Sequence, residues 1–182
     1  MRAQKYSFLL KKIYVNLLIV ILFFFVLIIN GCCAYSFTGS NAPEHIKTIA
    51  IPVVDDRSGF GEPGLREQVT NELNRKFVDD NTLRVTDRTN ANSVLECTIT
   101  SISDVPGVVS AGETVSQRKL TISIIVVYKD LVKRKTVYER TFSQYAYYPQ
   151  ENVDNIAERK VAIAKAIDTI TQDILLDTVS GW

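Results

Sequence analysis

The chain has 182 residues, of which 46% are hydrophobic and 23% charged, and its formal net charge is +1. A chain of this length accommodates one domain with a buried core. The near-neutral charge excludes the class of nucleic-acid-binding proteins that depend on an excess of Lys and Arg, so no nucleic-acid partner is expected.

The N-terminus has the features of a secretory signal, with Lys and Arg residues, no acidic residue, and an apolar stretch from Ile13 to Ile29. Asn30 and Gly31 then lead directly into Cys32, an arrangement that resembles the bacterial lipobox. In lipobox chemistry the thiol receives a diacylglycerol, and cleavage leaves an N-terminal cysteine that carries fatty acyl chains such as palmitate. We therefore expect residues 1–31 to be removed and Cys32 to anchor the chain in a membrane. The alternative is an uncleaved transmembrane helix, for which this stretch is at the lower limit of about 17–25 residues.

Removal of residues 1–31 takes away four of the 21 basic residues and none of the 20 acidic ones, which leaves 17 against 20 and a formal net charge of −3. We expect residues 32–46 to form a lipidated tether and residues 47–182 to form a single domain. Alternation around Cys97 places its thiol on the same strand face as Leu95 and Ile99, which favours a small buried side chain over a disulfide with Cys33.

The domain begins with a β-branched run over residues 47–54, which predicts a short strand that Pro52 confines to an end or an edge. A loop rich in Gly, Pro and Asp follows. Apolar residues at every fourth position then predict an amphipathic helix. These residues are Leu65, Val69, Leu73 and Phe77.

The next segments alternate between apolar and polar residues, which predicts strands at residues 83–87, 94–104, 119–129 and 136–148. The last two are expected to form an antiparallel pair through a turn at 130–134. From Val153 to about Val179 the period changes to 3.6, which predicts a helix of roughly 25 residues. The fold class is therefore α+β, a two-layer sandwich with two helices packed on one face of a mixed four- to five-stranded sheet.

Catalytic motifs are not evident in the sequence. The single histidine, His45, falls in the tether without a Cys or His at ligand spacing, and a nucleophile would need a base within reach. We expect no enzymatic activity, no metal site and no cofactor. Tyr145, Tyr147 and Tyr148 form an aromatic cluster near a strand end, which is either a surface that contacts a partner or lipid, or an ordinary half-exposed strand terminus.

Several segments, taken in order, resemble the lipopolysaccharide-assembly lipoprotein family, the LptE-like proteins, in their Bacteroidetes-type form. The likeness covers the chain from Cys32 onwards. The segments that carry it are Tyr35-Ser36-Phe37-Thr38-Gly39, Lys47-Thr48-Ile49-Ala50-Ile51-Pro52, Leu95-Glu96, Ile99-Thr100, Arg118-Lys119-Leu120-Thr121-Ile122, Phe142-Ser143, Tyr145-Ala146, Asp173-Ile174 and Trp182.

The resemblance implies two helices on one face of a sheet of about four strands. It also implies an outer-membrane lipoprotein that partners and plugs an LptD-type β-barrel, so that the pair inserts lipopolysaccharide into the outer leaflet. The domain would lie on the periplasmic side or within the barrel lumen. Cys33 stands where similar sequences often carry Gly.

Basic side chains near strand ends are candidates to contact lipopolysaccharide phosphates, although an ordinary solvated face is the alternative. These residues are Arg118, Lys119, Lys133, Arg134 and Lys135. The competing interpretation of the whole chain is a free-standing periplasmic lipoprotein that binds an amphipathic ligand or peptidoglycan.

Overall fold

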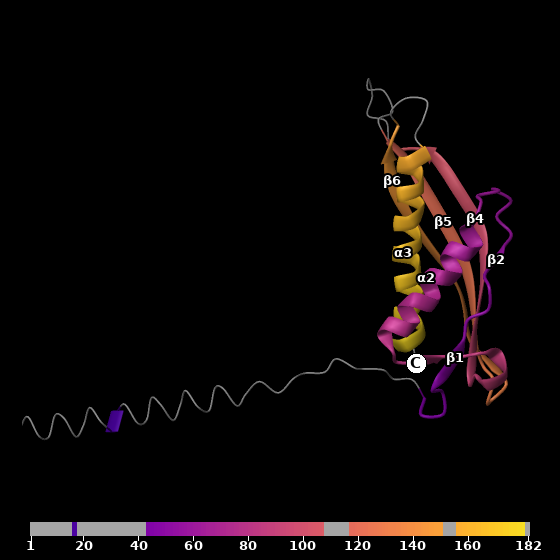
Figure 1. The fold of residues 1–182 in the computed structure, drawn as a ribbon, viewed down its shortest axis with the longest axis vertical. Coiled ribbons are helices and arrows are strands. Elements are labelled where there is room, and N and C mark those ends of the chain that lie inside the picture. Colours follow the sequence, from indigo (N-terminus) through magenta and orange to yellow (C-terminus); the bar gives the residue numbers. More distant parts are fainter. Residues whose placement is uncertain (1–15, 18–42, 108–116, 151–155, 181–182) are drawn as a thin grey trace, which may run out of the picture. The chain divides into compact units, whose positions relative to one another are not determined.

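The computed structural model describes residues 16–17, 43–107, 117–150 and 156–180. The fold lies within the compact unit Ser40–Trp182 (Figure 1). Cys32 and Cys33 lie outside the described residues. None of the helices in the described part of the chain is both long enough and apolar enough to cross a membrane.

The sheet is mixed, as expected, and contains six strands in the described residues. Their order is β3-β1-β4-β5-β6. β2 lies off this path and pairs with β4. β1 is parallel to β3 and β4, β2 is parallel to β4, and the β4-β5-β6 meander is antiparallel. The strands are β1 (Thr48–Ala50), β2 (Asp55–Asp56), β3 (Arg84–Val85), β4 (Ser93–Pro106), β5 (Gln117–Asp130) and β6 (Lys135–Pro149).

The expected first strand ends early, and an additional strand, β2, follows it, which accounts for the count above four or five. Pro52 has no amide proton to donate to a sheet. The chain therefore leaves β1 after Ala50 and pairs with β4 again only at Asp55 and Asp56, which had been assigned to a loop. The predicted antiparallel pair and its turn are confirmed, since β5 and β6 pair along their whole length.

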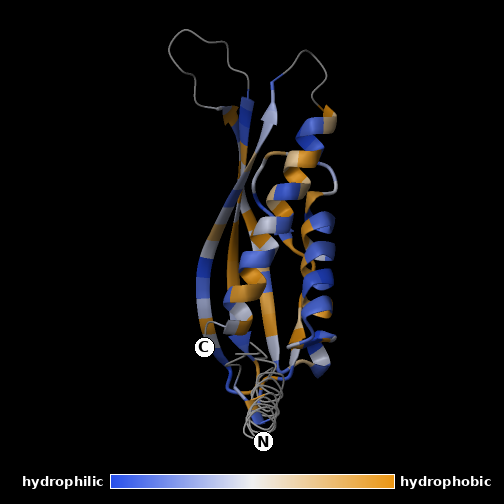
Figure 2. Ribbon diagram, turned by 90° about the vertical axis from the view of Figure 1, so that its left-hand side faces the viewer, coloured by the Kyte–Doolittle hydropathy of each residue, from blue (hydrophilic) through white to orange (hydrophobic). Residues whose placement is uncertain are grey.

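Two helices, α2 (Leu65–Asp80) and α3 (Ile156–Ser180), cover one face of the sheet and leave the other face open (Figure 2). The predicted apolar face of α2 is confirmed, because its four residues are all buried: Leu65, Val69, Leu73 and Phe77. The 25 residues of α3 match the predicted length. Between the helices and the sheet lies the apolar core, to which β5 contributes one side chain in two. These five side chains have no exposed surface: Leu120, Ile122, Ile124, Val126 and Tyr128.

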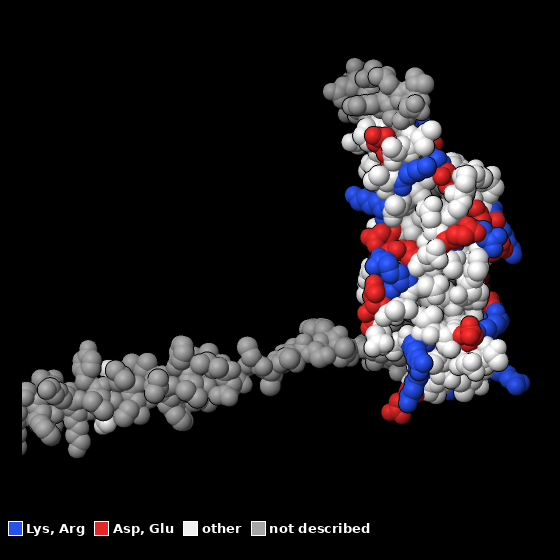
Figure 3. Space-filling view, viewed as in Figure 1, with Lys and Arg blue, Asp and Glu red and all other residues white. Residues whose placement is uncertain are grey.

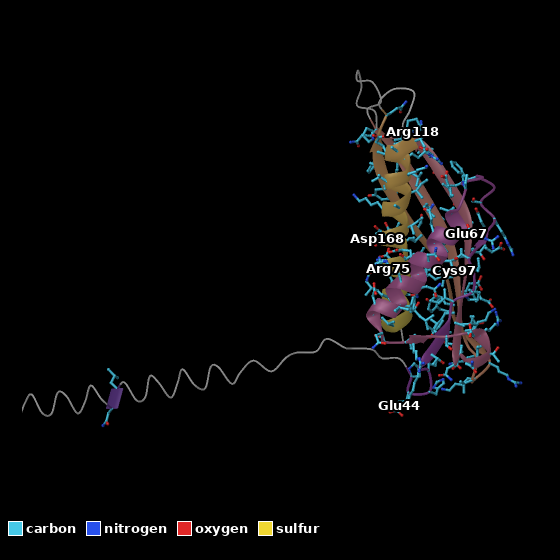
Figure 4. The ribbon with its side chains drawn as sticks, viewed as in Figure 1. Glu44, Glu67, Arg75, Cys97, Arg118 and Asp168 are labelled. Atoms are coloured by element: carbon cyan, nitrogen blue, oxygen red, sulfur yellow. The ribbon has the colours of Figure 1, made fainter. Side chains whose placement is uncertain are left out.

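The two helices are also joined by charged side chains. Lys76 of α2 donates a hydrogen bond of 2.7 Å to Asp168 of α3, and this contact lowers the pKa of Asp168. Arg75 pairs with Glu72 and Asp79 on its own helix, and Figure 4 shows it on the same side of the molecule as Asp168. On the face seen in Figure 3, basic and acidic side chains are interspersed without a large field of one sign.

A bulge in β4 changes which side chains face the helices. Up to Ile99, odd-numbered residues of β4 are buried against the helices. The register against β5 shifts between Ile99 and Ser101, so that Ile102 and Asp104 pair with inward-facing residues of β5. Asp104 therefore lies on the helix-covered face, whereas uninterrupted alternation would place it on the open face.

The chain enters the domain at the end of the sheet where β5 turns into β6. Ile46 is buried in the core, and the His45 ring lies 2.7 Å from the Asp130 carboxylate, Nε2 to Oδ2. We call this end, with Asp130 and the turn that follows it, the base. The opposite end, where β4 and β6 finish and β5 begins, we call the tip. The 14 residues of β5 separate the two ends by about 45 Å.

Candidate functional site

The tip contains a cluster of charged and polar side chains on the helix-covered face. The Asp104 carboxylate accepts hydrogen bonds from Arg118 Nε at 2.8 Å, Tyr148 Oη at 2.6 Å and Arg159 Nε at 3.3 Å. Arg159 also donates to Glu62 at 2.6 Å. The cluster therefore ties all three strands of the meander to α3 and to the loop that precedes α2.

This cluster is mostly shielded from solvent, with side-chain exposures of 11% for Asp104 and 28% for Arg118. The hydrogen bond to Asp104 raises the pKa of Arg118. Burial raises the pKa of Tyr148, and its hydrogen bond to Asp104 adds to the effect. Arg118, labelled in Figure 4, is therefore a paired structural cation at the tip, and its guanidinium is largely occupied by Asp104.

A second group of the predicted residues meets on the open face of the same end. Lys119 pairs in register with Tyr147, and Thr121 pairs with Tyr145. The Lys119 ammonium lies 4.1 Å from the centre of the Tyr145 ring, and the Tyr145 and Tyr147 rings are in edge contact at 5.4 Å. Tyr145 and Tyr147 are 50% and 47% exposed. We call Lys119, Tyr145 and Tyr147 the tip patch.

The three tyrosines of the predicted aromatic cluster do not act together. Alternation along β6 directs Tyr145 and Tyr147 to the open face and Tyr148 to the helix-covered face, where it is only 5% exposed. Surface contact of Tyr148 with a partner is therefore not available in this conformation, because its hydroxyl is bonded to Asp104. Its role in the described structure is to support the polar cluster.

A shallow groove of about 320 Å³ lies beside the tip patch, between the end of β6 and the first turns of α3. Tyr147 and Tyr148 line one side, while Ala157 and Val161 line the other, with Lys165 at the helix side. Val161 is 68% exposed although it is apolar. The groove and the tip patch together form a continuous surface that combines aromatic, aliphatic and cationic groups, which suits an amphipathic ligand.

The other predicted cations lie at the base and not at the tip. Lys133 and Arg134 belong to the turn after β5, and Lys135 begins β6. They are therefore about 35 Å from Lys119, because 11 residue steps along β5 separate Lys119 from the end of the strand. The five predicted basic residues consequently form no single site. Among the described residues, no group of three or more His, Cys, Asp or Glu side chains is placed to hold a metal ion.

Some of the residues at these ends were not identified from the sequence. The local sequence around Asp104 and Arg159 does not indicate that the two side chains meet, because the bulge in β4 and the packing of α3 bring them together. Glu62 was read as part of a turn. The one available clue was Ile102, whose apolar side chain breaks the alternation that precedes it. His45, which appeared to be a tether residue without a partner, contacts buried Asp130.

The sequence was then compared with known proteins. The sequence model of the LptE family, described as lipopolysaccharide-assembly, matches residues 46–178. This range contains the core strands, both helices except for the last two residues of α3, and every residue of the tip cluster and tip patch. No curated protein sequence matches the chain.

Solved structures share the fold at low sequence identity. A protein from Xanthomonas campestris has a TM-score of 0.58 at 16% identity, over 76% of this chain and 87% of that chain. A minor lipoprotein from Acinetobacter baumannii has a TM-score of 0.53 at 12% identity, over 75% and 94%. The rare lipoprotein B from Shewanella oneidensis has a TM-score of 0.50 at 12% identity, over 72% and 95%. At these identities the likeness concerns the fold.

Proposed function

The chain belongs to the LptE lipopolysaccharide-assembly family, and from this membership we propose that it is an outer-membrane lipoprotein that partners and plugs an LptD-type β-barrel. In this role the protein binds the barrel and occupies its lumen, and it catalyses no reaction. Residues 1–31 act as the signal peptide, Cys32 carries the lipid, residues 32–46 form the tether and residues 47–182 form the functional domain. The observation that carries this proposal is the family match over residues 46–178.

The physical properties of the domain support a role as a plug. A body that fills a barrel lumen needs rigidity, and here the long meander is backed by two helices that are joined by Lys76 and Asp168. It also needs a polar surface to face the polar interior of a barrel. The open face of the sheet provides hydroxyl groups, among them Ser123 and Ser143, whose side chains are hydrogen-bonded at 3.1 Å.

The tip patch and the adjacent groove are the proposed contact for lipopolysaccharide. A glycolipid presents phosphates, sugars and acyl chains. Lys119 offers a cation for a phosphate, tyrosine rings stack against sugars, and the groove next to Val161 offers apolar surface for part of an acyl chain. Arg118 contributes indirectly by fixing β4 against β5 beneath the patch.

The proposal is tested by isolating the tagged full-length lipoprotein from its native membrane in mild detergent and identifying co-purified proteins by mass spectrometry. We expect one large outer-membrane β-barrel in stoichiometric amount. An unrelated tagged lipoprotein at equal expression serves as the control. Depletion of the protein should also stall the arrival of lipopolysaccharide at the cell surface. Recovery of the lipoprotein without any β-barrel protein would refute the partnership.

The groove favours one second candidate, a free-standing periplasmic lipoprotein that binds an amphipathic ligand or peptidoglycan. In that case the same isolation yields the lipoprotein alone, and its depletion leaves lipopolysaccharide export intact. A lipid extract of the isolated protein, analysed by mass spectrometry, then identifies the ligand. The two functions are separated by the presence or absence of the barrel.

A further inference from the structure

The turn between β5 and β6 has an unusual combination of side chains. Val132 is apolar and 55% exposed at the first part of the turn, and three consecutive exposed cations follow it, Lys133, Arg134 and Lys135. Within the described part of the chain, none of these three cations takes part in an ion pair. Of the other exposed basic residues, Arg57, Arg75 and Arg88 have carboxylate partners, whereas Lys47, Arg84 and Lys160 have no ion pair within the described residues.

Hydrogen bonds hold the backbone of the turn in a defined shape, so the positions of these side chains on the surface are defined. Asp130 Oδ1 accepts hydrogen bonds from the amides of Val132 at 2.9 Å and Lys133 at 2.8 Å. The Leu131 amide donates to the carbonyl of Asn92 at 2.9 Å. Because the Asp130 carboxylate is buried and engaged in this way, it does not neutralise the cations above it.

The position of the turn indicates what it faces. The chain enters the domain at the same end, and His45 is bonded to Asp130 at the root of the turn. Only residues 33–42 separate Cys32 from Pro43, a length that spans at most about 40 Å when fully extended. A lipid at Cys32 therefore keeps the base close to the leaflet that holds it.

We propose that the turn Val132–Lys135 docks on the anionic phospholipid surface of the leaflet that holds the anchor. Val132 enters the headgroup region, and Lys133, Arg134 and Lys135 lie against the phosphates. The inference rests on the proposed lipid anchor at Cys32. It assigns these three cations to phospholipid, whereas lipopolysaccharide is left to the tip patch about 35 Å away.

Docking at the base adds a second membrane signal to the acyl chains. Each Lys or Arg close to an anionic membrane strengthens binding about fivefold, so three give about 100-fold in total. Lys47, exposed where the chain enters the domain, offsets the neighbouring Glu44, which Figure 4 labels at this end. The consequence is that the base is held at the surface of the leaflet that carries the anchor.

A single-tryptophan reporter tests the docking in the full chain, since Trp182 is the one tryptophan in the sequence. Trp182→Phe is combined with Val132→Trp, and the protein is reconstituted into vesicles that contain brominated phosphatidylglycerol or brominated phosphatidylcholine. We expect strong quenching by the anionic lipid. The matched control places the reporter at the tip, Val105→Trp, at a valine that is 44% exposed, and should show little quenching.

Neutralisation of the turn gives the second arm of the test. Lys133→Gln, Arg134→Asn and Lys135→Gln together should lower the quenching at position 132 at least fivefold, as should 0.5 M salt. Asn is chosen at position 134 because the φ of Arg134 is 52°, in the left-handed region that Asn tolerates. The control triple Arg57→Gln, Arg66→Gln and Lys160→Gln removes the same charge from other exposed positions and should leave quenching unchanged.

Equal quenching at positions 132 and 105 overturns the docking, as does quenching that the triple neutralisation does not lower. A response to vesicles with lipopolysaccharide but not to those with phosphatidylglycerol also overturns it, because the turn is then a glycolipid contact. Failure of the anchor is detected separately, by mass spectrometry of the mature N-terminus. The unprocessed chain retains its apolar segment 13–29, so the reporter still gives an answer on vesicles.

Discussion

Asp104 and Arg118 are joined across neighbouring antiparallel strands by a hydrogen bond of 2.8 Å between Oδ1 and Nε, and Arg118 also donates to the Asp104 carbonyl oxygen. The same carboxylate binds Tyr148 and Arg159. The Asp104 carboxylate thus partly neutralises both Arg118 of the sheet and Arg159 of the helix layer.

Replacement of this carboxylate is expected to destabilise the domain. Asp104→Asn removes the negative charge between Arg118 and Arg159 and should lower the free energy of unfolding by about 2 kcal/mol. Urea unfolding of the full chain in mild detergent measures the change. Arg57→Gln is the control, because it breaks an ion pair with Asp55 in which both side chains are more than half exposed, and it should cost less than about 0.5 kcal/mol. Equal losses in the two variants would contradict a structural role for the cluster.

The contact between His45 and Asp130 predicts a dependence of stability on pH. Burial alone would raise the pKa of Asp130, but hydrogen bonds from His45 and from the Lys133 and Val132 amides outweigh it, so the pKa lies below its usual value. The folded state therefore binds the proton less readily than the unfolded state. The resulting stability is complete above the ordinary aspartate pKa of about 4 and is lost as the pH falls through the lower folded-state value.

Asp130→Asn should accordingly lower stability by about 1–3 kcal/mol at pH 7 and flatten the loss of stability between pH 5 and pH 3. Thermal unfolding of the full chain across this pH range measures both effects. Asp55→Asn, at an exposed carboxylate, is the matched control and should leave the profile unchanged. A variant at position 130 with the wild-type slope would show that the acid sensitivity comes from other groups.

The tip patch makes a prediction about ligand binding that is separate from stability. Lys119→Gln and Tyr145→Ala each remove one partner of an exposed cation–π contact and should weaken binding of purified lipopolysaccharide about threefold to fivefold. Tyr138→Phe removes a hydroxyl that is hydrogen-bonded to Thr178 outside the groove and the tip patch, so it should lower stability by about 1 kcal/mol without affecting binding. Calorimetric titration of each variant separates the two roles. Binding losses that simply follow stability would argue against the patch.

The proposed lipid anchor at Cys32 makes a prediction about assembly. Cys32→Ala prevents lipidation, and the proposed function then requires reduced pairing with the barrel at native expression, because the domain is no longer confined to the membrane in which the barrel is assembled. Quantification of the barrel co-isolated with the tagged protein measures the effect. Cys33→Ala, one residue away, is the control and should leave pairing intact. Normal pairing of the Cys32 variant would show that the anchor is dispensable.

Regular elements were predictable from the sequence because their pattern is local. Leu120, Ile122 and Ile124 alternate strictly in β5, and α3 repeats isoleucine at helical spacing, so the two layers follow directly. The β4 bulge was not predictable, since no residue type at Thr100 requires it. The position of Asp104 on the helix-covered face depends on this bulge and was not predictable either. Likewise, β2 contains only Asp55 and Asp56, whose side chains disfavour strands, and its formation depends on β4 as a template.

The candidate site was predictable only in part. The predicted antiparallel pair of β5 and β6 brings Lys119, Tyr145 and Tyr147 to the same end, and the observed register places Lys119 opposite Tyr147. Their separation from Lys133 follows from the length of the hairpin. The five basic residues were grouped only because they carry the same charge. The sequence does not show which of them already have a carboxylate partner, and Arg118 is paired with Asp104.

The position of β6 at the margin of the sheet has a consequence for the life of the protein before assembly. Over Lys135–Pro149 this strand pairs only with β5 among the described strands, so one row of its peptide groups is open to another extended chain. Lys135, Glu139 and Arg140 interrupt the strand with charge, which is how natural sheets discourage edge-to-edge aggregation. These three side chains therefore protect the margin of a long hairpin from pairing with another extended chain before the protein meets the partner that we propose.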